Sequence, residues 1–263
     1  MGFFAIAKKA ASMSLEGVRG ATEFRPPTQD VGLPYGGHIG ALAQVNDAAF
    51  LVANMLGSIV EPPGTGEVVV KAISRVRMDG WPNDTQLHRY YLTTGDDGME
   101  KERYIQVVSN SGVPREAMYF SSLFRLYPDS PDVIRFYNGE DEKDRIGGQE
   151  WFFARSDLEK WLNKSQLQTL GTMEELVYQR AVGDGVYHPP LTGVENRIDD
   201  AVGNTGLRQR LWCMPHVRAL DTIQEHLVIS LEIMDTHDGK REKEVHVDFM
   251  VGISIATTDF RII

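Results

Sequence analysis

Short runs of alternating apolar and polar residues constrain the fold of this chain more than any other feature. Aromatic and β-branched residues fill these runs, and an alternation of period two is typical of strands with one buried face. The clearest runs are residues 67–78, 86–93, 103–109, 118–127, 225–234 and 242–255. Turn sequences such as Asn110-Ser111-Gly112 and Asp238-Gly239 separate consecutive runs and favour hairpins between them. We therefore predict an α+β, mainly β protein of antiparallel meander sheets with a few peripheral helices.

Helices are predicted where local capping signals occur. Asp47 stands where an N-cap would start a short helix that ends at Leu56. Ser156 and Glu159 have the spacing of a capping box, which predicts a helix that reaches Asn163. Residues 132–137, by contrast, are predicted to continue the meander as a strand.

The chain divides into three parts by composition. Residues 1–16 are predicted to form an N-terminal amphipathic helix, and residues 17–34, rich in Gly, Pro and polar residues, are predicted to form a linker. Residues 35–263 form the β-rich globular body. Within it, residues 183–206 hold Pro189-Pro190 and few large apolar residues, which indicates a long loop and a candidate point of division near 165–206.

The N-terminal helix carries apolar side chains on one side and lysines at its margin or opposite. The residues proposed for contact with a membrane or a partner are Phe3, Phe4, Ile6, Lys8 and Lys9. A helix with this pattern either lies in a membrane interface or docks on its own domain or on a partner protein. Both alternatives remain open.

Composition limits the partners and the compartment. The net charge of −10 disfavours contact with phosphate backbones, so we predict no nucleic acid partner. Cys213 is the single cysteine and has apolar neighbours, which indicates a buried side chain in a reducing compartment. No apolar run is long enough to span a membrane as a helix, and no secretory signal is recognised. We expect a cytoplasmic protein, with peripheral contact at the inner membrane through the first helix.

No motif with the spacing of a catalytic, cofactor or metal site stands out. The glycine-rich segment Gly36-Gly37-His38-Ile39-Gly40 lacks the Lys-Ser/Thr of a phosphate-binding loop, which favours a tight turn. A G-x-S-x-G elbow is absent, and no acidic cluster has the spacing of a calcium loop. We therefore predict no catalytic residue, no cofactor and no metal ligand.

Two weaker groupings remain as hypotheses. Cys213, His216 and His226 are the nearest to a metal set, and His226 and His246 could meet across the final hairpin. The alternative is isolated strand histidines. Four arginines on or beside neighbouring strands either form an anion-binding patch or belong to the polar face of a sheet: Arg75, Arg77, Arg89 and Arg103.

A series of short motifs resembles a known family. They are Leu33-Pro34-Tyr35-Gly36, Ile39-Gly40, Asn46-Asp47 with Phe50, His88-Arg89-Tyr90-Tyr91, Tyr104-Ile105-Gln106-Val107, Phe124-Arg125-Leu126-Tyr127 and Ile146-Gly147-Gly148. Their order is similar to that of the bacterial family of unknown function numbered 2491. The resemblance implies a cytoplasmic protein of Gram-negative bacteria with an accessory role in envelope stress, encoded beside a phage-shock-A-like protein. It implies no catalytic residues.

Three functions are therefore weighed. The first is a non-enzymatic adaptor that binds other proteins, with a phage-shock-A-like protein as a candidate partner. The second is a structural subunit of a phage or secretion-type assembly, which would make a homo-oligomer. The third is an enzyme with an unrecognised site that acts on a polyamine or a phosphate ester, since an acidic surface attracts cations.

Overall fold

The computed structural model describes residues 28–64, 68–93, 101–140, 145–236 and 244–263. The predicted helix over residues 1–16 lies outside these ranges, as do Phe3, Phe4, Ile6, Lys8 and Lys9. Most of the predicted linker lies outside them as well. No helix among the described residues is long and apolar enough to cross a membrane.

Antiparallel strands dominate the structure, which confirms the mainly β class. The strands are β1 (Leu42–Val45), β2 (Val68–Met78), β3 (Thr85–Leu92), β4 (Arg103–Asn110), β5 (Val113–Leu126), β6 (Glu150–Ala154), β7 (Glu175–Arg180), β8 (Leu191–Ile198), β9 (Gly206–Leu220), β10 (Ile223–Thr236), β11 (Glu244–Ile255) and β12 (Phe260–Ile262). Every pair of neighbouring strands is antiparallel. Six of these strands coincide closely with the alternating runs of the sequence.

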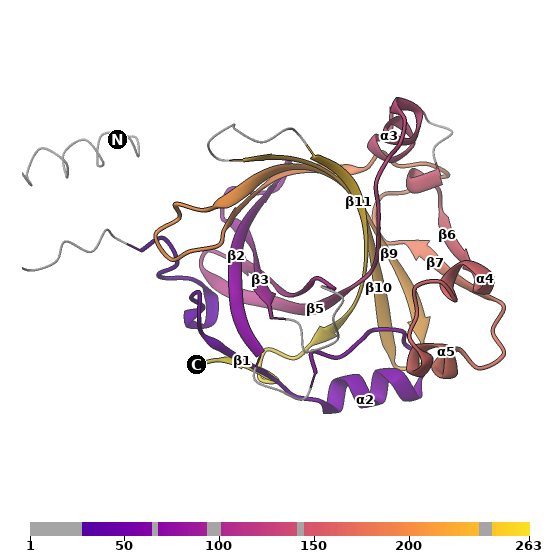
Figure 1. Cartoon of the computed structure of the whole chain (residues 1–263), viewed down its shortest axis with the longest axis horizontal. Coiled ribbons are helices and arrows are strands. Elements are labelled where there is room, and N and C mark those ends of the chain that lie inside the picture. The colour runs from indigo at the N-terminus through magenta and orange to yellow at the C-terminus, as the bar shows by residue number, and fades with distance from the viewer. Residues whose placement is uncertain (1–27, 65–67, 94–100, 141–144, 237–243) are drawn as a thin grey trace, which may run out of the picture.

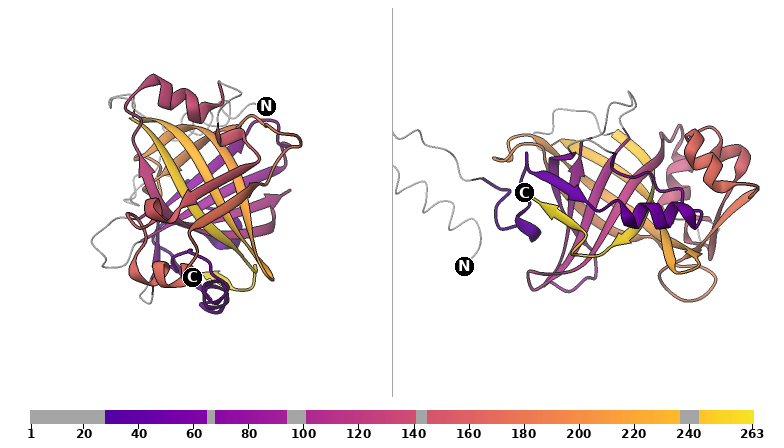
Figure 2. Two further views of the ribbon diagram at one scale, coloured as in Figure 1. Left: turned by 90° about the vertical axis from the view of Figure 1, so that its right-hand side faces the viewer. Right: turned by 90° about the horizontal axis from the view of Figure 1, so that it is seen from below.

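Eight strands close into a barrel. The order around it is β2-β3-β4-β5-β11-β10-β9-β8, and β8 closes the ring because it pairs with both β9 and β2. Figure 1 looks along the barrel, and Figure 2 shows its tilted strands from the side. Strands β1 and β12 extend the sheet from one end of β2, while β6 and β7 extend it from β9.

Strand β8 corrects the interpretation of residues 183–206 as a long loop. Its inward-facing residues include Gly193 and Glu195, so the strand lacks the apolar alternation by which the other strands were recognised. At Gly193 a Cβ atom would lie 2.7 Å from the backbone oxygen of Arg77, because β2 and β8 approach closely there. A strand with a polar inner face therefore completes the barrel.

The segment at 132–137 is helical, so the predicted strand there is wrong. Helix α3 (Pro131–Asn138) begins at Ser130, whose hydroxyl accepts a hydrogen bond from the Val133 N–H at 3.4 Å. Pro131 occupies the first turn, and Gly139 ends the helix in the left-handed conformation with φ of 75°. These local capping signals prevail over the short apolar pattern.

The other helices agree only in part with the predictions from the sequence. Helix α2 (Ala48–Met55) confirms the prediction after Asp47, although the Asp47 side chain makes no capping bond. The predicted helix from Ser156 is reduced to α4 (Arg155–Leu158). The capping box lies instead at α5 (Lys164–Leu170), where Asn163 and Gln166 exchange side-chain to backbone bonds.

A second layer packs on the outside of the barrel at β5, β11, β10 and β9. Figure 1 shows β6, β7, α4 and α5 on this side. Phe249 of β11 stacks on Phe124 of β5 with ring centroids 4.2 Å apart, and both rings contact Phe153 of β6. The main apolar core is therefore formed by the outward face of the barrel, which leaves the inward face free to be polar.

Candidate functional site

The inside of the barrel holds an apolar part and a charged part. The apolar part contains two clusters of buried side chains that face inward: Val76, Met78, Leu87, Leu211 and Cys213; and Ala72, Tyr91, Tyr104, Phe120 and Met250. Cys213 is buried as the sequence predicted, and burial raises the pKa of its thiol to about 11. The thiol is therefore protonated and unreactive at neutral pH.

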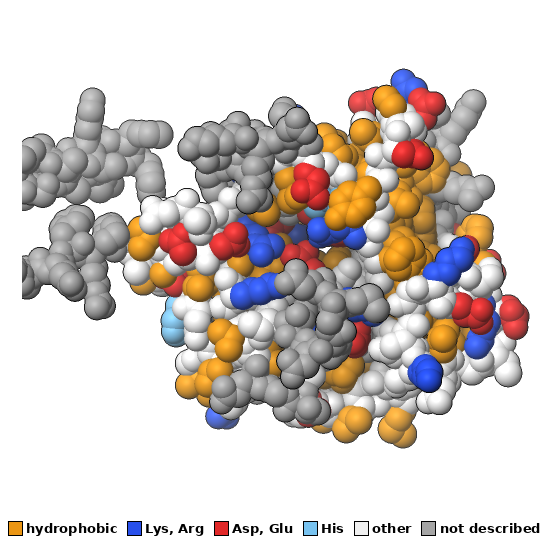
Figure 3. Space-filling model, viewed as in Figure 1, with side chains coloured by type: hydrophobic (Ala, Val, Ile, Leu, Met, Phe, Trp, Pro, Cys, Tyr) orange, Lys and Arg blue, Asp and Glu red, His pale blue; other side chains and the backbone are white. Residues whose placement is uncertain are grey.

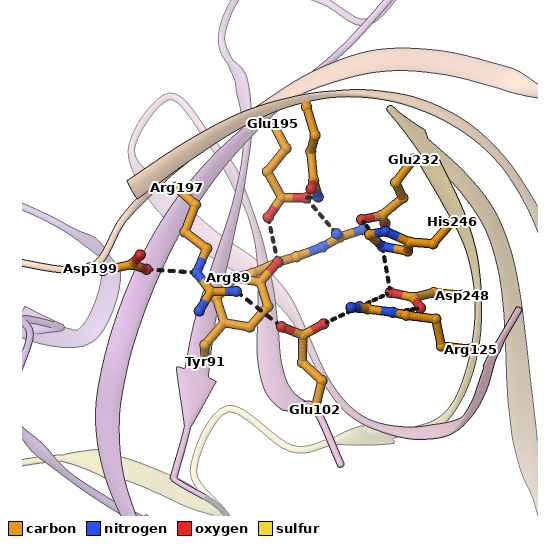
Figure 4. Close-up of polar contacts among 11 residues, drawn as sticks. Arg89, Tyr91, Glu102, Arg125, Glu195, Arg197, Asp199, Glu232, His246 and Asp248 are labelled. Carbon is orange, nitrogen blue, oxygen red and sulfur yellow. Dashed lines mark hydrogen bonds and ion pairs between the residues drawn. The ribbon is translucent and has the colours of Figure 1, made fainter. Parts of the chain in front are cut away.

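Glu195 is the centre of one of the two groups of polar side chains that make up the charged part. It is fully buried, and its carboxylate accepts hydrogen bonds from Tyr91 Oη at 2.5 Å, Arg89 Nη1 at 2.7 Å and Gln209 Nε2 at 2.9 Å. Figure 4 shows Arg89 and Tyr91 converging on this carboxylate. Three donors satisfy this buried carboxyl group, so its position in the barrel is fixed.

A chain of ion pairs crosses the opening of the barrel. Arg197 donates to Glu102 at 3.0 Å, and Arg125 bridges Glu102 at 3.3 Å to Asp248 at 2.6 Å. The guanidinium of Arg197 also lies 4.3 Å from the centre of the Tyr91 ring. Figure 3 shows charged side chains of both signs gathered over the barrel in this view.

Glu232, His246 and Asp248 form a compact buried trio beside this chain. His246 Nε2 lies 3.3 Å from a carboxylate oxygen of Glu232 and 3.4 Å from one of Asp248. One ligand atom from each residue falls within 4.8 Å of the others, and no other such group of three occurs among the described residues. Neither nitrogen of the His246 ring makes a hydrogen bond of ordinary geometry to a described residue.

The register of the last hairpin explains how the trio forms. His246 and Asp248 are two residues apart on β11, so both side chains point into the barrel. Glu232 of β10 lies directly opposite His246 in the antiparallel pair. Arg125 of β5 lies opposite Asp248 from the other side and holds its carboxylate with two hydrogen bonds of 2.6 Å.

The charges inside the barrel do not balance when His246 is left out of the count. Among the side chains of Figure 4, leaving aside the exposed Asp199, the carboxylates outnumber the arginines by one: Glu102, Glu195, Glu232 and Asp248 face Arg89, Arg125 and Arg197. Glu232 is the carboxylate to which no arginine is bonded. Its charge must be neutralised by a proton or by another cation.

The pKa values of the trio reflect this excess. Burial raises the pKa of Glu232, and the nearby negative charges of Asp248 and Glu195 raise it further. Burial alone would lower the pKa of His246, but the carboxylates of Asp248 and Glu232 outweigh it and raise the pKa to about 9. His246 and Arg125 hold the pKa of Asp248 below its usual value despite its burial. In the absence of a metal ion, His246 therefore retains its proton at neutral pH.

The histidine pair suggested by the sequence does not form. His246 lies opposite Glu232, while His226 lies opposite Gly252 and Val217. The set of Cys213, His216 and His226 does not form either, since the trio is the one group of this kind among the described residues. Cys213 faces the barrel interior, whereas His216 is an odd number of residues away and contacts Trp151 on the outside.

The four arginines of the sequence analysis do not share one face. Arg89 points into the barrel and pairs with Glu195, whereas Arg103 is buried on the outside and pairs with Glu61 at 3.0 Å. Arg75 and Arg77 share the outer face of β2. The glycine-rich segment follows a short 3-10 turn (Pro34–Gly36), in agreement with the turn interpretation.

Comparison with known proteins found no matching family model, no matching curated protein and no matching solved structure. The resemblance to the family numbered 2491, and the partners that it implies, therefore stay predictions.

Proposed function

We propose that this chain is a binding protein whose barrel holds one divalent metal ion between Glu232, His246 and Asp248. The observation that carries the proposal is the position of His246 Nε2, 3.3 and 3.4 Å from two carboxylate oxygens without ordinary hydrogen-bond geometry. Ligand atoms that are each ~2.1 Å from one cation stand roughly 3.0–3.4 Å from one another. The two spacings around His246 thus suit a shared cation.

The chemistry of the ligands selects the class of metal. One imidazole and two carboxylates suit Zn²⁺, Mn²⁺ or Fe²⁺ better than Ca²⁺ or Mg²⁺, which prefer oxygen ligands alone. Arg125 would support the site from outside, because its two hydrogen bonds to Asp248 fix the orientation of that carboxylate. A cation would also neutralise Glu232, to which no arginine is bonded.

We expect metal-free protein to bind Zn²⁺ or Mn²⁺ with a stoichiometry of one in calorimetric titration. Each of His246→Gln and Glu232→Gln should weaken binding at least about tenfold, since each removes one of three protein ligands. His88→Gln is the matched control, because His88 is buried in the same barrel wall but faces outward, and it should leave binding unchanged. No binding by the unaltered chain, or equal loss in the control, would leave the trio as a proton-sharing cluster.

A second function is favoured by the surface of α2. Three large apolar side chains of this short helix are exposed: Leu51 at 63%, Val52 at 47% and Met55 at 87%. Beside them lies a groove of about 520 Å³ between α2 and the ends of β10 and β11. Exposed apolar patches of this kind mark protein contact sites. They support the adaptor hypothesis, with a phage-shock-A-like protein or a second copy of this chain as the candidate partner.

We expect Leu51→Lys with Met55→Lys to abolish capture of such a partner in a pull-down with the full chain. Val186→Lys is the control, because Val186 is 79% exposed but lies away from α2 in the chain. Light scattering of the purified chains separates the two candidate partners. If the partner is a second copy of this chain, the measured particle mass should fall on substitution. If the partner is another protein, the mass of the purified chain should stay the same. Capture that survives the double substitution would exclude α2 as the contact surface.

Cytoplasmic location and peripheral contact with the inner membrane stay predictions.

A further inference from the structure

A cavity of about 500 Å³ lies where β2 turns into β3. Its lining residues come from the end of β2, the β2–β3 turn, the start of β3 and two neighbouring segments: Gly32, Leu33, Arg75, Val76, Arg77, Met78, Trp81, Pro82, Asn83, Thr85, Gln86, Leu87, His88 and Asn196. None of them is acidic. The cavity is thus positively charged in a chain whose net charge is −10.

The strand register brings the polar residues of this cavity together. Arg75 lies opposite His88 of β3 on one side and opposite Asn196 of β8 on the other. Arg77 follows two residues later on the same face of β2, about 7 Å along the strand. Two guanidinium groups therefore border one cavity, with amide side chains beside them.

The two arginines differ from the buried and half-buried arginines of the barrel, which pair with carboxylates. Arg89, Arg125 and Arg218 each pair with a carboxylate. Arg77 makes no hydrogen bond or ion pair to any residue that the structure describes, and Arg75 donates only to the backbone oxygen of Gln29 at 3.4 Å.

The nearest carboxylates of the β2–β3 turn do not neutralise these charges. Asp79 accepts a hydrogen bond from the Thr192 hydroxyl at 2.6 Å, and Asp84 accepts one from Ser111 at 3.1 Å. Neither residue lines the cavity. The positive charge of Arg75 and Arg77 is therefore available to an anion.

Two further side chains suit an organic ligand rather than a bare ion. Trp81 lines the cavity and is 37% exposed, so a planar ring can pack against its indole. His88 is 3% exposed, and its Nδ1 atom has no hydrogen-bond partner among the described residues. Burial, and then the charge of Arg75, lower the pKa of His88 to about 4, so His88 adds no further charge at neutral pH.

We propose that this cavity binds a small organic phosphate, with the phosphate between Arg75 and Arg77 and a planar ring against Trp81. Arginine suits phosphate because its planar guanidinium offers several donors at a matching spacing. The volume falls within the range of roughly 300–1,000 Å³ that is usual for small-molecule sites. A nucleoside diphosphate is the probe of this class that we choose.

The test is calorimetric titration of the full chain with ADP, adenosine and inorganic phosphate. EDTA is present throughout, so that the barrel metal site does not contribute. We expect ADP to bind more tightly than either fragment, because only ADP uses both the arginines and Trp81. Arg75→Gln with Arg77→Gln should weaken ADP binding at least about tenfold, and Trp81→Leu should weaken it less.

Arg208 and Arg210 provide the matched control. They are exposed, two residues apart and on the same outer face, and Arg208 lies opposite Asn196 of β8, but neither lines the cavity. Arg208→Gln with Arg210→Gln makes the same change in charge and should leave ADP binding unchanged. Absence of ADP binding by the unaltered chain would overturn the proposal. So would an equal loss in both double variants, which would indicate diffuse attraction of anions to this wall.

Discussion

Glu225→Ala is expected to lower the free energy of unfolding by about 3–5 kcal/mol, because it leaves a buried charge without its partner. The Glu225 carboxylate is fully buried and accepts five hydrogen bonds. Two come from Arg218, at 2.7 and 3.1 Å, and the others from Ser58 Oγ at 2.6 Å, Tyr178 Oη at 2.6 Å and the Ile59 N–H at 2.7 Å. The alanine variant would leave the Ser58, Tyr178 and Ile59 donors without this acceptor in the interior, and Arg218 would keep only its bond to the backbone oxygen of Gly57 at 2.8 Å.

The position of Glu225 explains why the loss of stability should affect the whole molecule. Glu225 lies on β10 of the barrel, Tyr178 on β7 of the outer layer, and Ser58 in the segment that follows α2. One carboxylate therefore ties three parts of the molecule together. Its removal weakens both the barrel wall and the attachment of the outer layer.

Urea unfolding at pH 6.5 measures this effect. Glu225→Gln should cost less than the alanine variant, because the amide oxygen still accepts hydrogen bonds although the charge is lost. Glu159→Ala is the surface control, since Glu159 is half exposed and pairs only with Arg155, and its effect should stay below ~0.5 kcal/mol. An effect of Glu225→Ala as small as that of the control would contradict the proposed role.

The strands with an apolar face could be predicted from the sequence, because each buries one face in the outer core. Strand β3 shows why the pattern works, since Tyr90 faces the core while the polar Arg89 beside it faces inward. The polar interior of the barrel also explains why β8 was taken for a loop. Its Glu195 and Arg197 point into the barrel, so the strand lacks the apolar alternation of the others. Barrel closure depends on pairing between β2 and β8, which are more than one hundred residues apart, and no local pattern reports it.

The trio of Glu232, His246 and Asp248 was missed for a related reason. Its local signal was present, because His246 and Asp248 have the i, i+2 spacing of one strand face, and the hairpin that pairs β10 with β11 was predicted. Glu232 joins them only through the register of that hairpin, and a shift by one residue would turn it to the opposite face. A meeting of His246 with His226 across this hairpin was one hypothesis beside isolated strand histidines, and the register excludes that meeting.

Stability of the metal-free protein is expected to peak near pH 6.5 and to fall on both sides. On the acid side, burial lowers the pKa values of His88 and His216 to about 4, against 6.5 in the unfolded chain. The unfolded chain therefore takes up protons that the folded chain refuses as the pH falls below 6.5. Each histidine should cost about 2 kcal/mol by pH 5.

On the alkaline side, the stability of the folded chain falls as the pH rises, which is the reverse of the acid side. The pKa of His246 is raised to about 9 by its two carboxylate neighbours, so the folded chain holds a proton that the unfolded chain releases above pH 6.5. This stabilisation is complete below pH 6.5 and is lost as the pH rises through about 9, which amounts to roughly 3 kcal/mol. The stability is therefore highest near pH 6.5, between its fall on the acid side (the acid limb) and its fall on the alkaline side (the alkaline limb).

Urea unfolding in EDTA at pH 5, 6.5 and 9 tests both limbs with separate variants. His216→Phe should flatten the acid limb by about 2 kcal/mol, because phenylalanine fills the same apolar site beside Trp151 without taking up a proton. His246→Gln should flatten only the alkaline limb. A stability that stays level from pH 6.5 to 9 in the unaltered chain would mean that His246 is not held protonated between Glu232 and Asp248. The excess negative charge in the barrel would then have to be neutralised by a proton on Glu232 itself.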